Sequence, residues 1–156
     1  MSADLRNRLE LALASAREAG RSTLEYFRSA DLSVELKRDD SPVTIADRQA
    51  EKLLRERIAA RFPDDAVLGE EFGEAPGTSG FRWILDPIDG TKSFIHGVPL
   101  YGTLVGVEHQ GRPVLGVIYM PALDECAYAA RGEGSWYTRG ESAPQPARVS
   151  TRASLA

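Results

Sequence analysis

The sequence predicts an α+β fold in which two N-terminal helices pack on one face of a largely antiparallel β-sheet. Apolar residues recur at helical spacing up to Phe62, whereas five short apolar runs separated by turn residues follow. Helices that precede a series of short strands pack as a layer on the resulting sheet. The 156 residues are 42% hydrophobic and 27% charged, so the chain can bury a core and is not disordered as a whole.

Two amphipathic helices are expected, over residues 2–29 and 44–61. Thr44 can cap the second helix, and Asp47, three residues later, can reach back to the first backbone N–H. Pro63 follows the last turn of that helix. The apolar positions are Leu5, Leu9, Leu13, Ala16, Leu24 and Phe27 in the first helix and Ala50, Leu53, Leu54, Ile58 and Phe62 in the second.

Short strands and turns make up the rest of the chain. Residues 37–42 are expected to form a loop or hairpin tip, and Gln110-Gly111-Arg112 joins two strands as a hairpin. We expect residues 1–140 to form one domain and the tail 141–156, with its two prolines, to be a linker whose small residues could begin another element. The expected strands are 33–36, 66–68, 81–85, 101–108, 113–119 and 125–130.

Charge and cysteine content exclude several classes of function. The 19 Lys and Arg against 23 Asp and Glu give a net charge of −4, without the basic excess typical of nucleic-acid-binding proteins. The single cysteine, Cys126, excludes an internal disulfide and a Cys-rich zinc site and is expected in the core. The charged N-terminus is not typical of a targeting peptide, and no apolar run could span a bilayer. We therefore expect a cytoplasmic protein with no nucleic-acid or membrane partner.

Two carboxylates follow an apolar run in the segment 83–94. Asp86 and Asp89 are separated by a proline that restricts the backbone, so both are expected at the end of a strand. Gly90 permits a close turn, and Thr91 supplies a hydroxyl and an N–H where a helix or a nest of amides could start. Carboxylates with nearby carbonyls suit Mg²⁺, and adjacent N–H groups suit a phosphate oxygen. A turn with two solvated acids is the alternative on spacing alone.

Other polar positions have both a structural and a chemical interpretation. Glu70 and Glu71 follow the 66–68 strand and offer two more carboxylates at a strand end, although such a pair is often simply solvated. Asp47 is explained by its helix cap, and Lys37 is either a surface lysine or part of the entrance to a metal site.

Several motifs occur in the order seen in one enzyme family. They are Lys37 with Ser41-Pro42-Val43-Thr44-Ile45-Ala46-Asp47, then Gly69-Glu70-Glu71, Trp83 with Asp86-Pro87-Ile88-Asp89-Gly90-Thr91, Gly116-Val117-Ile118-Tyr119, Pro121, and Gly132-Glu133-Gly134. In this order they resemble the inositol monophosphatase family of Mg²⁺-dependent phosphatases. The similarity covers about residues 5–150 and implies the N-terminal half of a layered α/β sugar-phosphatase fold.

The resemblance implies a site for two or three Mg²⁺ ions. Glu70 and Asp86 would bind the first ion together with the main-chain carbonyl of Ile88, and Asp86 would bridge to a second ion bound by Asp89. Hydrolysis of a phosphate monoester needs charge neutralisation, an oriented water and a stabilised leaving group. A metal pair meets these three needs without a covalent phosphoenzyme.

The resemblance also implies catalytic and phosphate-binding roles. The Thr91 hydroxyl would help Glu70 orient the attacking water, and Asp47 would support Thr91 while still capping its helix. The amides of Gly90 and Thr91 would donate to the phosphate. Lys92 could add positive charge beside the phosphate, with an exposed surface lysine as the alternative.

The residues after Thr91 favour one branch of the family. Lys92-Ser93-Phe94 resembles the histidinol-phosphatase branch, so we expect hydrolysis of histidinol phosphate, a step of histidine biosynthesis. The expected partner is thus a small phosphorylated metabolite, and the resemblance implies a homodimer. Alternatives are an inositol-1-monophosphatase, a 3′-phosphoadenosine-5′-phosphate phosphatase, or a truncated, inactive module that binds metal or phosphate.

The sequence departs from the family pattern towards its C-terminal end. Relatives continue into a second α/β domain whose Trp-Asp motif supplies a further metal-binding aspartate and much of the pocket for the alcohol. Trp136 is followed here by Tyr137, so no residue of this chain is assigned that role. We expect residues 141–156 to lead into a second domain that is absent. A further alternative is a structural or truncated product whose exposed apolar sheet face must be covered by a partner.

Overall fold

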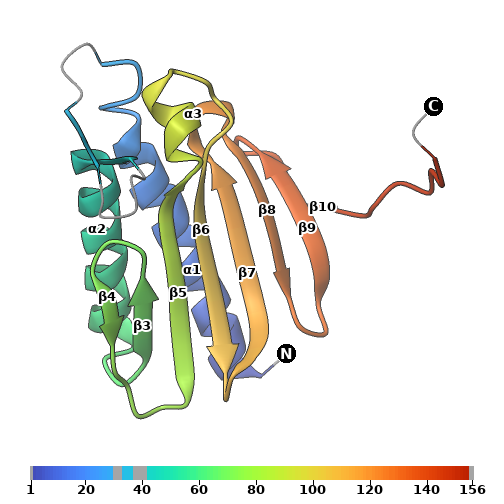
Figure 1. Cartoon of the computed structure of the whole chain (residues 1–156). Coiled ribbons are helices and arrows are strands. Elements are labelled where there is room, and N and C mark those ends of the chain that lie inside the picture. The colour runs from blue at the N-terminus through green and yellow to red at the C-terminus, as the bar shows by residue number, and fades with distance from the viewer. Residues whose placement is uncertain (1, 30–32, 37–41, 155–156) are drawn as a thin grey trace.

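The computed structural model describes residues 2–29, 33–36 and 42–154, whose helices and strands form two layers (Figure 1). Lys37 and most of the expected 37–42 loop lie outside the described residues. The elements, in chain order, are α1 (Ala3–Thr23), β1 (Val34–Leu36), β2 (Pro42–Thr44), α2 (Ile45–Arg61), β3 (Ala66–Gly69), β4 (Gly73–Ala75), β5 (Phe81–Asp89), α3 (Thr91–Ile95), β6 (Gly102–His109), β7 (Arg112–Met120), the 3₁₀ turn Pro121–Leu123, β8 (Glu125–Ala130), β9 (Gly134–Arg139) and β10 (Gln145–Pro146).

The described strands form one large sheet and one small hairpin. The sheet has eight strands in the order β10-β9-β8-β7-β6-β5-β3-β4, and β1 pairs with β2 separately. Of the neighbouring pairs, β3 and β5 run parallel and the others antiparallel, which confirms the largely antiparallel sheet. The predicted hairpin between β6 and β7 has φ values of 51° at Gln110 and 73° at Gly111. Two successive positive φ values are typical of the type I′ turn, whose twist matches that of the strands.

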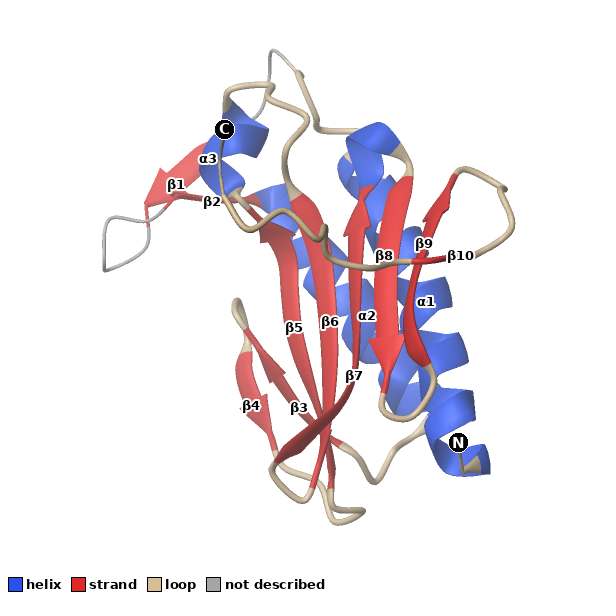
Figure 2. Cartoon of the chain, turned by 90° about the vertical axis from the view of Figure 1, so that its right-hand side faces the viewer, coloured by secondary structure: helices blue, strands red, loops and turns tan. Residues whose placement is uncertain are grey.

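Both long helices lie on one face of the sheet, as predicted (Figure 2). Helix α2 begins after Thr44, and its predicted capping box is present. Helix α1 ends at Thr23, several residues before its predicted end. The turn that follows brings the Phe27 ring to 5.8 Å from the ring centroid of Phe94 and 5.2 Å from that of Tyr101. The expected apolar residue Phe27 is therefore packed in a turn rather than on the helix face.

Four described strands lie outside the predicted ones: β2, β4, β9 and β10. They are two to six residues long. Strand β10 pairs with Trp136 and Tyr137 of β9, so the tail that was expected to be a linker first adds a short strand to the sheet. Pairing with a neighbour, which sequence patterning does not reveal, stabilises strands this short.

Small residues allow α1 to lie close against the sheet. Ala12, Ala16 and Ala19 are fully buried at this contact. A side chain at Gly20 would place its Cβ 2.6 Å from Cδ1 of Tyr119, so glycine is needed at this position. Cys126 is buried in β8, which confirms the prediction of a core residue.

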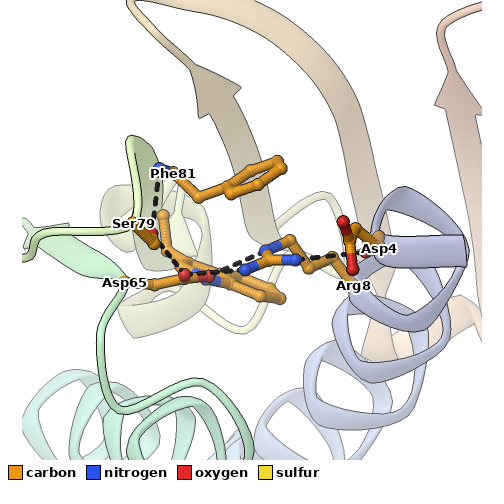
Figure 3. Close-up of polar contacts among 6 residues, drawn as sticks. Asp4, Arg8, Asp65, Ser79 and Phe81 are labelled. Atoms are coloured by element: carbon orange, nitrogen blue, oxygen red, sulfur yellow. Dashed lines mark hydrogen bonds and ion pairs between the residues drawn. The ribbon is translucent and has the colours of Figure 1, made fainter. Parts of the chain in front are cut away.

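A buried ion pair joins α1 to the loop before β3 (Figure 3). Arg8 donates from Nε and Nη2 to the two carboxylate oxygens of Asp65, each over 2.8 Å. The same carboxylate accepts from Ser79 Oγ over 2.6 Å and from Trp83 Nε1 over 2.8 Å. Burial acts to raise the pKa of Asp65, but these hydrogen bonds outweigh it and hold the pKa below its usual value. We call this group of four residues the Asp65 network.

The sheet face opposite the helices is apolar and carries no helix layer in the described part of the chain (Figure 2). A shallow hollow on this face is lined by Leu104, Ile118, Ala129 and Trp136, among others. Ile118 is 49% exposed, which is unusual for a central strand residue. The expected exposed apolar face is therefore present. None of the described helices is long and apolar enough to cross a bilayer.

Candidate metal and phosphate site

Sheet topology brings two acidic segments together. Strands β3 and β5 run parallel, and Gly69 at the end of β3 pairs with Leu85. The N–H of Glu70 donates to the carbonyl of Leu85 over 3.2 Å. Glu70 therefore follows a strand end, as expected, and lies close enough to Asp86 for their side chains to interact.

Asp89 is the last residue of β5, which agrees with the prediction of an acid at a strand end, whereas Asp86 lies three residues inside the strand. Strand β5 continues as far as Asp89. Asp86 pairs with Leu104 and Asp89 with Gly102, which leaves one extra residue on β5. This irregularity is a β-bulge, a device that re-aims side chains within a strand.

Two threonine hydroxyls hold the carbonyls between these acids. Thr103 Oγ1 on β6 donates to the carbonyl of Pro87 over 2.9 Å, where the proline itself has no N–H to pair. Thr91 Oγ1 donates to the carbonyl of Ile88 over 3.1 Å. A carbonyl oxygen has two lone pairs, so Ile88 keeps one for a further ligand.

Asp86 is the electrostatic centre of the site. Its Oδ1 is buried and has no hydrogen-bond partner within the described residues. Burial, followed by the nearby Glu70, Asp89 and Asp47, raises the pKa of Asp86 to about 8. A bound cation would reverse this effect, because it favours the charged carboxylate.

Gly90 turns the chain from β5 into α3. Its φ of 86° lies in the left-handed region, and an added Cβ would stand 3.2 Å from the carbonyl oxygen of Leu100. The helix starts at Thr91, and no side chain caps its first turn. The first N–H groups of a helix have no partner inside the helix, so a turn without a cap can donate to an anion. Lys92 is exposed in this turn.

Asp47 is buried beside the site and caps α2. Its Oδ2 accepts from the Thr44 N–H over 2.8 Å and from the Thr44 hydroxyl over 2.6 Å. Asp47 is only 2% exposed, and its charge contributes to the raised pKa of Asp86. The prediction that Asp47 caps α2 is confirmed, whereas its support of Thr91 stays a prediction, because the Thr91 hydroxyl is directed to Ile88.

The donor set suits a hard divalent cation. Glu70, Asp86 and Asp89 do not converge on one point, and in the described ranges no three His, Cys, Asp or Glu side chains form a ready metal-binding group. Like charges repel one another unless a cation compensates them. The carboxylate oxygens, the Ile88 carbonyl and the unsatisfied Oδ1 of Asp86 are the kind of ligands that Mg²⁺ prefers. These residues therefore fit Mg²⁺.

Glu51 is a residue near the site that the sequence analysis missed. It lies on α2 with its carboxylate fully buried, and it accepts hydrogen bonds from the N–H groups of Glu71 and Phe72. Its place four residues after Asp47, on the same face of the helix, is a signal that could have indicated it.

Comparisons with known proteins find relatives in sequence and in fold. The family model described as inositol monophosphatase family matches residues 4–156. A histidinol-phosphatase of Chlorobaculum parvum is 57% identical over 82% of this chain and 49% of its own length, and one of Mycobacterium tuberculosis is 42% identical over 94% and 56%. The solved extragenic suppressor protein suhB of Bartonella henselae superposes with a TM-score of 0.86 at 36% identity, over 94% of this chain and 55% of that structure. The chain thus spans about half the length of these relatives.

Proposed function

We infer that the chain is part of a phosphate monoester hydrolase, because it belongs to the inositol monophosphatase family. Within that family we propose Mg²⁺-dependent hydrolysis of histidinol phosphate. Two relatives described as histidinol-phosphatase and the Lys92-Ser93-Phe94 sequence support this substrate. The substrate would be a small phosphorylated metabolite.

The observation that carries the proposal is the buried Oδ1 of Asp86, which has no partner in the described chain. A native protein rarely leaves a buried carboxylate oxygen unsatisfied unless a ligand, ion or water completes it. Glu70, Asp89 and the carbonyl of Ile88 would hold two or three Mg²⁺ ions together with Asp86. Bound Mg²⁺ would supply charge neutralisation and an acidified water.

The chain's own residues would orient the reactants. Glu70 would accept a hydrogen bond from the attacking water, and the Thr91 hydroxyl would hold that water from the other side, while Asp47 keeps the start of α2 in place. The N–H groups of Gly90 and Thr91 would donate to the phosphate oxygens in the first turn of α3. Lys92 would contribute positive charge near the phosphate.

The remaining proposals concern the surroundings of the site. We propose that residues 141–156 lead from the 1–140 domain into a second α/β domain, which would supply a further metal ligand and the walls of the alcohol pocket. The apolar sheet face opposite the helices supports this arrangement, since a second layer would bury it. Dimerisation and a cytoplasmic location are further parts of the proposal.

A substrate panel tests the proposed function. The protein, in the full length that its gene encodes, is incubated with histidinol phosphate, inositol 1-phosphate or 3′-phosphoadenosine 5′-phosphate, and released phosphate is measured while Mg²⁺ is titrated. We expect the highest kcat/KM for histidinol phosphate and no release with a chelator present. A tenfold preference for inositol 1-phosphate would contradict histidinol phosphate as the substrate. Phosphate release that is unchanged by the chelator would contradict the proposed Mg²⁺ dependence.

A further inference from the structure

We propose that Glu51 is a positioning residue that holds Glu70 beside Asp86. The Glu51 carboxylate belongs to α2, but it is directed into the turn between β3 and β4. Its Oε2 accepts from the N–H of Glu71 over 2.7 Å, and its Oε1 accepts from the N–H of Phe72 over 3.2 Å. The Glu51 side chain is 0% exposed, so its carboxylate depends on these donors rather than on water.

Gly69 creates the space for this carboxylate. A Cβ on residue 69 would lie 1.9 Å from Oε1 of Glu51, far inside van der Waals contact. Residue 69 is in a regular strand conformation, so its backbone does not require glycine. The absence of a side chain at this position is therefore explained by the Glu51 carboxylate and by Arg55, whose Nη2 would lie 2.8 Å from the same Cβ.

Arg55 completes the contact from the same helix. Its Nε donates to Oε1 of Glu51 over 2.8 Å, one helical turn away, and its Nη2 donates to the carbonyl of Gly73 at the start of β4. The ion pair balances the buried charge of Glu51, since an unpaired buried carboxylate would be costly. The Glu51–Arg55 pair thus binds the backbone of this turn at three successive residues, Glu71, Phe72 and Gly73.

Glu70 is fixed from both sides by these contacts. On its N-terminal side its own N–H donates to Leu85 in β5, and on its C-terminal side the N–H of Glu71 is held by Glu51. Loss of the Glu51 contact would free the second side and let the Glu70 carboxylate move away from Asp86. This inference rests on the proposed function, in which Glu70 is a metal ligand. Groups that orient a metal ligand typically contribute 10- to 100-fold to metal affinity.

Two variants test the contact from its two sides. Glu51→Gln removes one acceptor oxygen and the charge, whereas Gly69→Ala keeps Glu51 but occupies its space. We expect each variant to weaken Mg²⁺ binding, measured by calorimetry, by about tenfold. The double variant should bind Mg²⁺ about as tightly as the single variant with the lower affinity. The two losses should not add, because both changes break the same contact. Amide hydrogen exchange at residues 70–72 should accelerate in all three proteins.

Asp65→Asn is the matched control. It also alters a buried carboxylate that pairs with an arginine and binds several donors, but it does so in the Asp65 network, outside the candidate site (Figure 3). We expect it to lower the unfolding midpoint at least as much as Glu51→Gln while Mg²⁺ affinity stays unchanged.

Distinct results would overturn the inference. If Glu51→Gln and Gly69→Ala lose stability but bind Mg²⁺ as tightly as the unmodified protein, Glu51 serves only the fold. If Asp65→Asn weakens binding equally, the effect is general loosening and the inference also fails. If the unmodified protein binds no Mg²⁺, the proposed function is contradicted, and the exchange rate at Glu70 alone then decides whether Glu51 positions it.

Discussion

Asp65 and Asp86 are two buried aspartates with opposite surroundings. The carboxylate of Asp65 receives two hydrogen bonds from Arg8 and one each from Ser79 and Trp83, and its pKa is lowered. Asp86 has a buried oxygen without a partner in the described chain and acidic neighbours, and its pKa is raised to about 8. The chain thus satisfies one negative charge and leaves the other unsatisfied.

The difference separates a structural carboxylate from a ligand-ready one. A buried carboxylate whose oxygens all accept hydrogen bonds stabilises one conformation and has no free lone pair for a ligand. A buried carboxylate that is crowded by like charges favours its protonated form until a cation arrives. Strain of this kind is typical of functional sites. Four predictions test the comparison, from the largest expected effect to the smallest.

Asp86→Asn should abolish the proposed activity and stabilise the metal-free fold. We expect phosphate release by the full-length protein to fall about 100-fold or more, because a ligand to the proposed metal pair is lost. The unfolding free energy without Mg²⁺ should rise at neutral pH, because asparagine is neutral in both states and residue 86 no longer has to take up a proton on folding. Phosphate assays and urea denaturation measure the two effects. Activity near that of the unmodified protein would contradict the assignment of Asp86.

Asp65→Asn should instead lower the unfolding free energy. It leaves the guanidinium of Arg8 buried without its ionic partner, and breaking a buried pair costs about 3 to 5 kcal/mol. Urea denaturation should show this loss of unfolding free energy. A loss below about 1 kcal/mol would mean that the Asp65 network is not the main link between α1 and the loop before β3.

Asp65 and Asp86 should contribute to the unfolding free energy with opposite pH dependences. The folded pKa of Asp86 lies above its unfolded value, so its contribution is present at low pH and is lost as the pH rises towards about 8. The folded pKa of Asp65 is lowered, so its contribution is present above its unfolded pKa and is lost as the pH falls through the folded value. Between about pH 5 and pH 8 we expect the unfolding free energy of the metal-free protein to fall as the pH rises, by about 4 kcal/mol at most.

Denaturation at a series of pH values in the presence of a chelator measures this slope. Asp86→Asn is the control, since it should remove the slope between about pH 5 and pH 8. A free energy of unfolding that stays constant over that range in the unmodified protein would show that Asp86 is already satisfied without metal.

Ser79→Ala should have the smallest effect. The substitution removes one of four hydrogen bonds to Asp65, from an exposed residue, and leaves the Arg8 ion pair in place. We expect a loss of about 1 kcal/mol in the unfolding free energy and no change in Mg²⁺ affinity. Thermal denaturation of Ser79→Ala and Asp65→Asn, compared side by side, shows whether the Ser79 hydroxyl or the Arg8 guanidinium contributes more to the stability of the Asp65 network. A loss as large as that of Asp65→Asn would assign the dominant part to Ser79.

Most of the fold could be predicted because it depends on local patterns. Thr44 with Asp47 identifies the start of α2, and the short apolar runs identify five strands of the sheet, which are β3, β5, β6, β7 and β8. The end of α1 and the short strands could not be predicted in the same way. They depend on contacts between distant residues, such as Phe27 with Tyr101 and β10 with β9.

The candidate site shows the same division. The types of its residues and their spacing indicate Glu70, Asp86 and Asp89 from the sequence alone. The bulge in β5 could not be predicted, because it exists only in register with β6. The contact between Glu51 and the turn after Gly69 joins residues 20 positions apart. No local pattern indicates such a contact.

The sequence by itself determined which segments form helices, which form strands, and which side chains can supply oxygen ligands. These properties depend on each residue and its near neighbours. Only the tertiary structure decided which buried carboxylate is satisfied. Asp65 meets Arg8 across 57 positions, whereas Asp86 meets Glu70, which follows the adjacent strand β3. The charge state of a buried group depends on what surrounds it in space, and this is why two chemically identical side chains differ here.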